Sequence, residues 1–275
     1  MSGAARDLPR RACGGFLAEI LRVERMATDV YGMVLEIEGG AARYPAPLPG
    51  QFVNVYLNDA SRLLPRPFGV CDWSEGRLTL VFGAAGAGTR QMASYARGTA
   101  LRVGPPAGRG FDTDAARDAS RVTLIGGGLG AAPLLFLAHA LRGDGAPPLR
   151  AVLGYRSEVF LAPAFDAARA ALHIATDDGS TGFHGSAVAL LKELPLAGGE
   201  RFFACGPAPM LRALSRFASG QGIALQLSLE ARMGCGYGAC LGCVCKIADG
   251  TEAFVNRRVC RDGPVFDGSE VIWDV

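Results

Sequence analysis

Long apolar runs are missing from this sequence, together with other marks of a membrane-bound or secreted chain. No stretch approaches the roughly 18 apolar residues that a membrane-spanning helix needs. Basic residues near the N-terminus are not followed by an apolar signal-peptide region, so residues 1–14 are predicted to be a short disordered tail. The formal net charge is only +2, which favours neither nucleic acid nor an anionic membrane as a partner. We therefore expect a cytoplasmic protein with no membrane or nucleic-acid partner.

The sequence also has few histidines and shows no recognisable hydrolytic triad. Its three histidines are scattered, and no serine–histidine–acid arrangement is evident. His139 lies in an apolar helical pattern and is expected to be packed or at the surface. Internal repeats are missing as well. With 275 residues, 49% of them hydrophobic and 20% charged, the chain has enough material for two domains and a small appendage.

Two hydrophobic patterns divide the chain. Up to about Pro106, short apolar runs alternate with Gly, Pro, Asn and Asp, which predicts an antiparallel β-barrel with one helix at 89–96. A polar stretch at 111–120 is interpreted as a linker. Apolar strands then alternate with amphipathic helices, which predicts a parallel sheet covered on both faces. The predicted fold class is α+β multidomain: a barrel over 15–112, an α/β parallel-sheet domain over 118–223 and a small β-rich segment over 224–275.

Cysteines are concentrated near the C-terminus. Five of the eight lie between positions 235 and 260, which indicates a metal site in a reducing compartment rather than disulfides. Cys235, Cys240 and Cys243 have the C-x4-C-x2-C spacing of a plant-type [2Fe–2S] loop, and Cys260 can complete the cage. Cys245 follows Cys243 too closely to share the cluster without strain. The alternative is a zinc knuckle, although paired C-x2-C motifs are missing.

Two stretches of the barrel region are candidate phosphate sites. Arg66-Pro67-Phe68-Gly69-Val70 stands on or just before a strand that is an edge strand or starts there, and its arginine can pair with a diphosphate. A surface arginine at a strand edge is the alternative. Gly88 and Thr89 end a glycine-rich loop at a helix start, where backbone N–H groups can bind phosphate and Thr89 can cap the helix. A flexible Gly/Ala hairpin is the alternative for this loop.

Two further motifs follow strands of the predicted parallel sheet. Gly127, Gly128 and Gly130 stand between a strand and a helix, as in a dinucleotide-binding turn. A purely structural glycine turn is the alternative. Cys205 and Gly206 end a later strand, where a side chain points into the crevice that binds ligands in such sheets. A buried small thiol is the alternative reading.

The order of these motifs resembles the ferredoxin-reductase superfamily and, more closely, the electron-transfer subunit of class 1B, NAD-dependent dihydroorotate dehydrogenase. The resemblance extends from about Phe16 to Val275 and is most specific from Leu229 to Phe266. It implies FAD in the barrel, NAD on the parallel-sheet domain and a [2Fe–2S] cluster in the C-terminal segment. One departure is Gly69, which stands where the superfamily usually has a serine near the flavin N5.

The resemblance also implies roles for single residues. The flavin would lie along 66–70, with its diphosphate at Gly88 and Thr89. Nicotinamide nucleotide would face Gly127, Gly128 and Gly130. Cys205 would be the catalytic side chain near the nicotinamide, with Gly206 beside it. Glu230 and Met233 would lie between the cluster and the flavin, and the metal ligands would be Cys235, Cys240, Cys243 and Cys260.

The implied function is electron transfer in pyrimidine biosynthesis. An FMN-containing dihydroorotate dehydrogenase catalytic subunit would supply electrons, which would pass through the cluster and FAD to NAD+ in a heterotetramer with two copies of each subunit. A related reductase subunit that serves another partner, such as a sulfhydrogenase, is the first alternative. A zinc-knuckle binding protein is the alternative from another class. Arg156, at the end of the second strand, leaves NADP open as the nucleotide.

Overall fold

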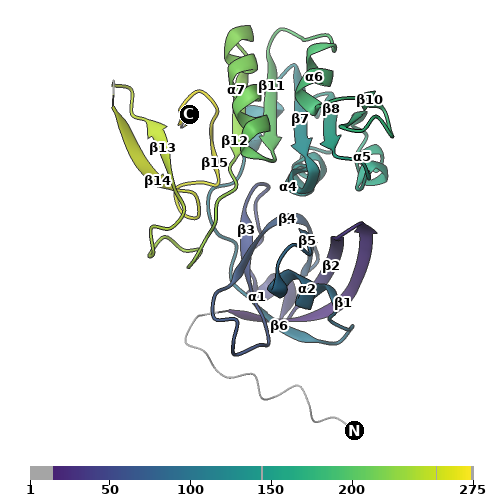
Figure 1. Ribbon diagram of the computed structural model, residues 1–275, viewed down its shortest axis with the longest axis vertical. Coiled ribbons are helices and arrows are strands. Elements are labelled where there is room, and N and C mark those ends of the chain that lie inside the picture. Colours follow the sequence, from purple (N-terminus) through teal and green to yellow (C-terminus); the bar gives the residue numbers. More distant parts are fainter. Residues whose placement is uncertain (1–14, 144, 252, 274–275) are drawn as a thin grey trace.

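The computed structural model describes residues 15–143, 145–251 and 253–273. The predicted tail at 1–14 lies outside these residues. Figure 1 shows a barrel, a sheet flanked by helices and a small separate ribbon of strands. Six antiparallel strands close the barrel in the order β1-β2-β5-β4-β3-β6. They are β1 (Phe16–Ala27), β2 (Val30–Ile37), β3 (Phe52–Tyr56), β4 (Arg66–Ser74), β5 (Arg77–Gly83) and β6 (Ala100–Val103), with short helices α1 (Gly40–Arg43) and α2 (Ala87–Ala93) between them.

Apolar side chains at alternate positions of the strands fill the interior of the barrel. Val53 and Val55 of β3 are fully buried in the barrel core, as are Leu78 and Leu80 of β5. Successive strand residues point to opposite faces, so the neighbours of these residues remain available for contacts outside the barrel. The closed order of six antiparallel strands confirms the predicted barrel.

Near the barrel, the helix predicted at 89–96 is present with shifted limits, whereas the predicted linker at 111–120 was wrong. The helix expected at 89–96 is α2, which begins at Ala87, because the Thr89 hydroxyl accepts from Gly86 N (3.0 Å) and donates to Gly86 O (3.1 Å), so it supports a turn that has already begun. The stretch at 111–120 is not a plain linker, since it contains helix α3 (Thr113–Arg117). The Asp112 side chain accepts from the Asp114 and Ala115 amides and caps this helix.

A seven-stranded sheet follows, in the order β10-β9-β8-β7-β11-β12-β15. Neighbouring strands are parallel except for β15, which pairs antiparallel with β12. The strands are β7 (Arg121–Gly127), β8 (Leu149–Tyr155), β9 (Ala171–Thr176), β10 (Phe183–His184), β11 (Glu200–Cys205), β12 (Ala224–Ser228) and β15 (Val265–Asp267). Between them lie the 3-10 turn η1 (Gly128–Gly130) and helices α4 (Ala131–Ala140), α5 (Ala162–Ala167), α6 (Ala187–Lys192) and α7 (Ala208–Gln221).

Helices cover both faces of this sheet, as the sequence predicted. Leu124 and Leu153 belong to the apolar core that also contains side chains of α4 and α5. The neighbouring strand residues Ile125 and Val152 belong to the second core, with side chains of α6 and α7. Side chains of alternating direction on each strand thus supply two separate cores.

A buried ionic network joins the amino ends of three strands. The Glu200 carboxylate pairs with Arg150 and accepts from the Thr123 hydroxyl and, at 2.9 Å, from the Ala197 amide. Arg150 also donates to the Thr123 hydroxyl at 3.0 Å and to the Pro195 carbonyl at 2.8 Å. The side chains of Arg150 and Glu200 are 5% and 0% exposed. Every charged group in this network is therefore paired inside the protein.

Helix α4 packs on barrel strand β4 and connects the two domains. At this contact, His139 Nδ1 lies 2.9 Å from Asp72 Oδ1, so the histidine is partly buried at a domain junction, in line with the expectation that it is packed or at the surface. A second polar contact joins the domains where the Thr28 hydroxyl donates to Glu158 at 2.7 Å. These contacts fix the barrel against the carboxyl end of the sheet.

Three late strands form an antiparallel ribbon in the order β14-β13-β16, of which β13 and β14 are labelled in Figure 1. Its members are β13 (Val244–Ala248), β14 (Phe254–Arg258) and β16 (Val271–Ile272). The predicted α+β architecture of barrel, parallel sheet and small β-rich segment is confirmed. The domain limits remain predictions. The predicted C-terminal segment, 224–275, contains β12 and β15, and both of these strands lie in the large sheet. Within the described residues, no helix combines the length and apolar composition that crossing a bilayer requires.

Candidate functional site

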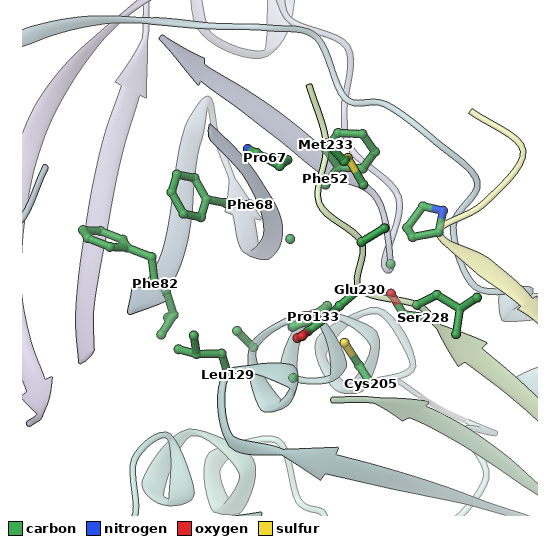
Figure 2. Close-up of a pocket in the computed structure, with 18 of the residues that line it drawn as sticks. Phe52, Pro67, Phe68, Phe82, Leu129, Pro133, Cys205, Ser228, Glu230 and Met233 are labelled. Carbon is green, nitrogen blue, oxygen red and sulfur yellow. The ribbon is translucent and has the colours of Figure 1, made fainter. Parts of the chain in front are cut away.

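A cavity of about 340 Å³ opens between the barrel and the carboxyl end of the parallel sheet. Figure 2 shows aromatic side chains of the barrel on one side and residues of the sheet domain on the other. The segment after β12 closes a third side. The lining comprises Gly50, Phe52, Pro67, Phe68, Gly69, Val81, Phe82, Gly83, Leu129, Gly130, Ala132, Pro133, Cys205, Ser228, Leu229, Glu230, Ala231, Met233 and Pro264. A mostly apolar cleft at a domain junction with a few polar groups is typical of a cofactor site.

The structure brings part of the predicted site residues to this cavity. Of the barrel motif, Pro67, Phe68 and Gly69 line it. Val70 instead is fully buried in the barrel core, so its predicted place along the flavin is not borne out by the cavity lining. Of the sheet residues, Gly130, Cys205 and Glu230 also line the cavity, whereas Gly127, Gly128 and Gly206 lie outside its lining.

Arg66 lies beside α2, away from the cavity lining. A side chain on Gly88 would approach the Arg66 guanidinium within 2.5–2.8 Å, so the two residues are in direct contact. The Thr89 hydroxyl is used by the helix cap. Nearby, burial raises the pKa of Tyr95, while a hydrogen bond with the Asn58 backbone and, to a smaller extent, the Arg66 charge act in the opposite direction. The Arg66 guanidinium at this edge of the barrel fits a phosphate-bearing cofactor.

At Gly130, the turn after β7 lies directly against the backbone at the end of β11. A Cβ atom there would lie 2.1 Å from the Cys205 carbonyl oxygen and 2.7 Å from Gly206 N. The glycine is therefore required because another backbone segment passes against it. This contact explains why the two glycine motifs, 75 residues apart in the chain, meet at one place.

Cys205 is buried next to two polar side chains of the cavity. Its pKa is raised to about 12, mainly by burial and then by the charge of Glu230, while a hydrogen bond with Ser228 acts in the opposite direction. Burial also raises the pKa of Glu230. Cys205 is thus a neutral thiol without thiolate character at physiological pH.

Several lining residues were not predicted. Phe52, Phe82, Leu129, Pro133 and Ser228 all face the cavity (Figure 2). Phe52 and Phe82 belong to strands whose alternation was visible in the sequence, but alternation does not reveal which face meets another domain. Pro133 follows the glycine turn closely and gave the clearest signal, since a proline in the first turn marks the start of a helix, here at the carboxyl end of a sheet strand.

Gly69 has room for the side chain that the superfamily usually carries. The three atoms nearest to a Cβ atom there would all belong to the Pro133 ring, at 3.4–3.8 Å, which is ordinary contact. We expect Gly69→Ser to fold, to bind FAD and to shift the flavin reduction potential, because it adds a hydroxyl to the cavity lining. Flavin absorbance, the thermal midpoint and a redox titration check this. Gly130→Ala is the matched comparison, and it should fail to accumulate as folded protein. An unchanged flavin potential in Gly69→Ser would contradict the expectation.

The cysteine loop, 235–243, approaches the segment that carries Cys260. Val259 N donates to Cys243 O at 2.9 Å, and Cys260 N lies 3.4 Å from Cys243 Sγ. The Cys235 thiol interacts with Cys240, and that of Cys260 with Cys243. Burial raises the pKa of Cys235, but hydrogen bonds from the backbone N–H groups of Tyr237 and Cys240 outweigh it and lower the pKa to about 6. The loop therefore favours a thiolate, the form that binds metal.

Two pairs of thiols fit a cluster better than a single ion. Among the described residues, no three His, Cys, Asp or Glu side chains converge on one metal-ion position. A [2Fe–2S] centre needs two thiolates on each of two irons, and the pairs Cys235/Cys240 and Cys243/Cys260 match this requirement. Cys245 lies on β13 opposite Arg257, at the side of this arrangement. The donor set is thus compatible with the cluster, whereas a zinc knuckle needs four convergent ligands.

An arginine braces the two segments that carry the cysteines. Arg258 pairs with Asp262 through two nitrogens, at 3.0 and 3.2 Å, and donates to the Gly238 carbonyl at 3.3 Å. Gly238 belongs to the first segment, and Asp262 lies two residues after Cys260 in the second. The brace holds the two halves of the cysteine site together within the protein.

The whole chain has a counterpart among solved structures. It superposes on an NADH-dependent reduced ferredoxin-NADP oxidoreductase, described in a study of flavin-based electron bifurcation, with a TM-score of 0.81 and 25% identity over 97% of this chain and 92% of that chain. A flavohemoglobin from Malassezia yamatoensis shares the fold over 76% of this chain and 57% of its own, with a TM-score of 0.67 and 19% identity. Fold and site together define an oxidoreductase of the ferredoxin-reductase type with an added iron–sulfur segment.

The sequence comparisons narrow this class. Residues 230–272 match the family model of the iron-sulfur cluster binding domain of dihydroorotate dehydrogenase B. The chain is 36% identical over 256 residues to the electron transfer subunit of dihydroorotate dehydrogenase B (NAD(+)) from Caldanaerobacter subterraneus subsp. tengcongensis, covering 93% of this chain and 98% of that protein. The same subunit from Bacillus caldolyticus is 41% identical over 230 residues, or 82% and 86% of the two chains. The chain belongs to the family of dihydroorotate dehydrogenase B (NAD(+)) electron transfer subunits, which confirms the resemblance found in its motifs.

Proposed function

We propose that this protein carries electrons from a dihydroorotate-oxidising partner subunit to NAD+, with FAD bound at the junction of barrel and sheet and a [2Fe–2S] cluster bound by the cysteine loop. When bound, these cofactors supply the redox chemistry: the cluster exchanges single electrons, and the flavin exchanges electrons singly or as a hydride. The protein's own part is to bind them, to set their separation and to exclude water.

One observation carries the proposal. The segment that closes the cavity, from Ser228 to Met233, leads within two residues to Cys235. Both sites are therefore built from one short continuous stretch of chain. Such an arrangement suits electron transfer between two cofactors, because the covalent connection limits how far apart they can move.

The residues have separable roles in this proposal. Pro67, Phe68 and Gly69 form the barrel wall beside the flavin ring, and Arg66 with Gly88 and Thr89 lies where its diphosphate would bind. NAD would bind at the carboxyl end of the sheet, over the loops that contain Gly127, Gly128, Gly130 and Gly206. Cys205 and Glu230 border the space between them. The cluster ligands would be Cys235, Cys240, Cys243 and Cys260.

The cysteine loop is also the best candidate for the partner interface. Tyr237 and Leu241 are 61% and 62% exposed, and Val244 is 43% exposed. Large apolar side chains exposed together beside a redox site favour a protein contact. We propose that an FMN-containing dihydroorotate dehydrogenase subunit covers them, in an assembly with two copies of each subunit.

Co-expression with such a subunit tests the function. The purified complex should contain flavin and iron, and it should reduce NAD+ when dihydroorotate is added. The isolated chain should keep its visible flavin and iron–sulfur absorption but should not oxidise dihydroorotate. A colourless, zinc-containing chain would contradict the proposal and support the zinc-knuckle alternative.

A second candidate is the same electron path with a different donor. It is favoured by the likeness to the NADH-dependent reduced ferredoxin-NADP oxidoreductase, which extends over nearly the whole chain. Reduced ferredoxin should then replace dihydroorotate as the donor, and no stable complex with a dihydroorotate dehydrogenase subunit should form.

We expect Cys205→Ala to slow NAD+ reduction on the order of tenfold to a hundredfold, because an altered cavity wall misplaces the nicotinamide. The pH profile from about pH 6 to pH 9 should keep its shape, because the Cys205 pKa of about 12 leaves the thiol neutral throughout. Stopped-flow measurement of flavin reduction by NADH checks both points. Cys245→Ser is the control, and it should retain the wild-type rate. A change in the profile caused by Cys205→Ala would show that the thiol titrates in this range.

A further inference from the structure

The outer face of barrel strand β3 separates the cavity from the cysteine loop. Val53 and Val55 point into the barrel, so Phe52 and Asn54 lie on the opposite face. Phe52 lines the cavity, at the side where Met233 also lies (Figure 2). It belongs to the same apolar cluster as Cys243 and Cys260. This strand therefore contributes side chains to the region between the two proposed cofactor sites.

Asn54 is the polar residue on this face. Its side chain is buried, and the amide Nδ2 lies 3.5 Å from the Cys235 carbonyl oxygen. A Cβ atom on Gly236 would fall 2.4 Å from Nδ2 and 2.5 Å from Oδ1. The backbone at Gly236 has φ +73°, in the left-handed region that favours glycine. The Cys235–Gly236 peptide thus rests directly on the Asn54 carboxamide.

The other end of the carboxamide is unsatisfied. Within the described residues, Asn54 Oδ1 is buried and has no hydrogen-bond partner. Opposite Asn54 in the sheet stands Pro67, which has no N–H to offer. An apolar side chain at position 54 would avoid this unpaired acceptor, so packing alone does not account for an amide here.

We propose that Asn54 is a positioning residue for the cluster. Its carboxamide fixes the peptide that carries the first ligand, Cys235, against the barrel, and its N–H group stabilises electron density near that ligand. Hydrogen bonds and charge around the cysteines are the means by which a protein sets a cluster's reduction potential. The inference rests on the proposed function, because it requires the cluster that the cysteine loop would hold.

Variants of the full-length holoprotein test this role. Asn54→Ala and Asn54→Asp should retain FAD and iron, yet shift the EPR g-values of the reduced cluster. Both should also lower its midpoint potential, with the larger fall for Asp because it can add a negative charge. Asn256→Ala is the matched control, since Asn256 is exposed on β14 of the same C-terminal segment. It should reproduce the wild-type spectrum and potential.

A double-mutant cycle separates positioning from a general loss of structure. Gly236→Ala alone should perturb the EPR spectrum, because its methyl group overlaps the Asn54 side chain. Combined with Asn54→Ala, which makes room for that methyl group, it should cause less than the sum of the two single shifts.

The outcomes are distinct. Wild-type EPR spectra and potentials in both Asn54 variants would overturn the inference, as would strict additivity in the cycle. A wild-type protein that binds no two-iron cluster would overturn the proposed function and this inference together. If the single Asn54 variants fold poorly, the Gly236→Ala spectrum decides: an unperturbed spectrum overturns the inference.

Discussion

Replacing Cys235 by serine is expected to abolish the iron–sulfur cluster. The variant should fall from about two irons per chain to near none, because the loop loses the thiolate that its own backbone N–H groups favour. FAD should remain, since the cavity lies in the barrel and sheet. Electron transfer from the partner should be lost, while NADH should still reduce the flavin. Iron analysis, the EPR signal of the reduced protein and NADH-driven flavin bleaching measure these three effects separately.

Cys245→Ser provides the matched control. Cys245 lies at the side of the two cysteine pairs, on a strand of the ribbon opposite Arg257, and its replacement should leave both irons bound. The proposed ligand set would be wrong if Cys245→Ser lost the cluster and Cys260→Ser kept it.

Replacing Glu200 by alanine is expected to give the largest loss of stability. Glu200 neutralises Arg150, whose side chain is 5% exposed, and it accepts hydrogen bonds from Thr123 and Ala197. Removing one partner of a buried ion pair leaves an uncompensated charge and costs about 3–5 kcal/mol. For a chain of this size, that cost corresponds to a fall of roughly 6–20 °C in the thermal midpoint. Differential scanning calorimetry of the holoprotein checks the expectation.

Glu36→Ala is the comparison for this effect. Glu36 and Arg77 form an ion pair at 3.7 Å in which the two side chains are 53% and 57% exposed. Exposed pairs contribute about 0–1 kcal/mol, so the thermal midpoint should barely change. Equal losses in Glu36→Ala and Glu200→Ala would show that burial of the network is not what stabilises the sheet.

Local patterns in the sequence were sufficient for the fold. The barrel and the two-faced sheet follow from alternation and from helical periodicity, which are properties of neighbouring residues. The cysteine spacing likewise reveals a metal site, because its ligands are close in the sequence. Helix α3 was missed since it is short and its one buried residue, Ala116, stands among polar residues.

Contacts between distant segments could not be predicted. Nothing near Phe52 indicates that its strand faces the sheet domain, and nothing near Asn54 indicates contact with a residue 182 positions further along. Gly130 illustrates the same limit. Its motif suggested a nucleotide site, but its missing side chain is explained by the Cys205 backbone, which only the tertiary structure brings close.

The place of β15 has a consequence for how the C-terminal segment can be altered. Since β15 returns to pair with β12, the cysteine-bearing stretch is an excursion between two adjacent strands of the large sheet. Truncation after Ser228 would strip β12 of its neighbour and leave a row of unsatisfied backbone groups, a template for aggregation. Shortening the excursion while keeping 264–268 would preserve that protection. An engineered form of the protein without iron is therefore better made by internal deletion than by removing the end of the chain.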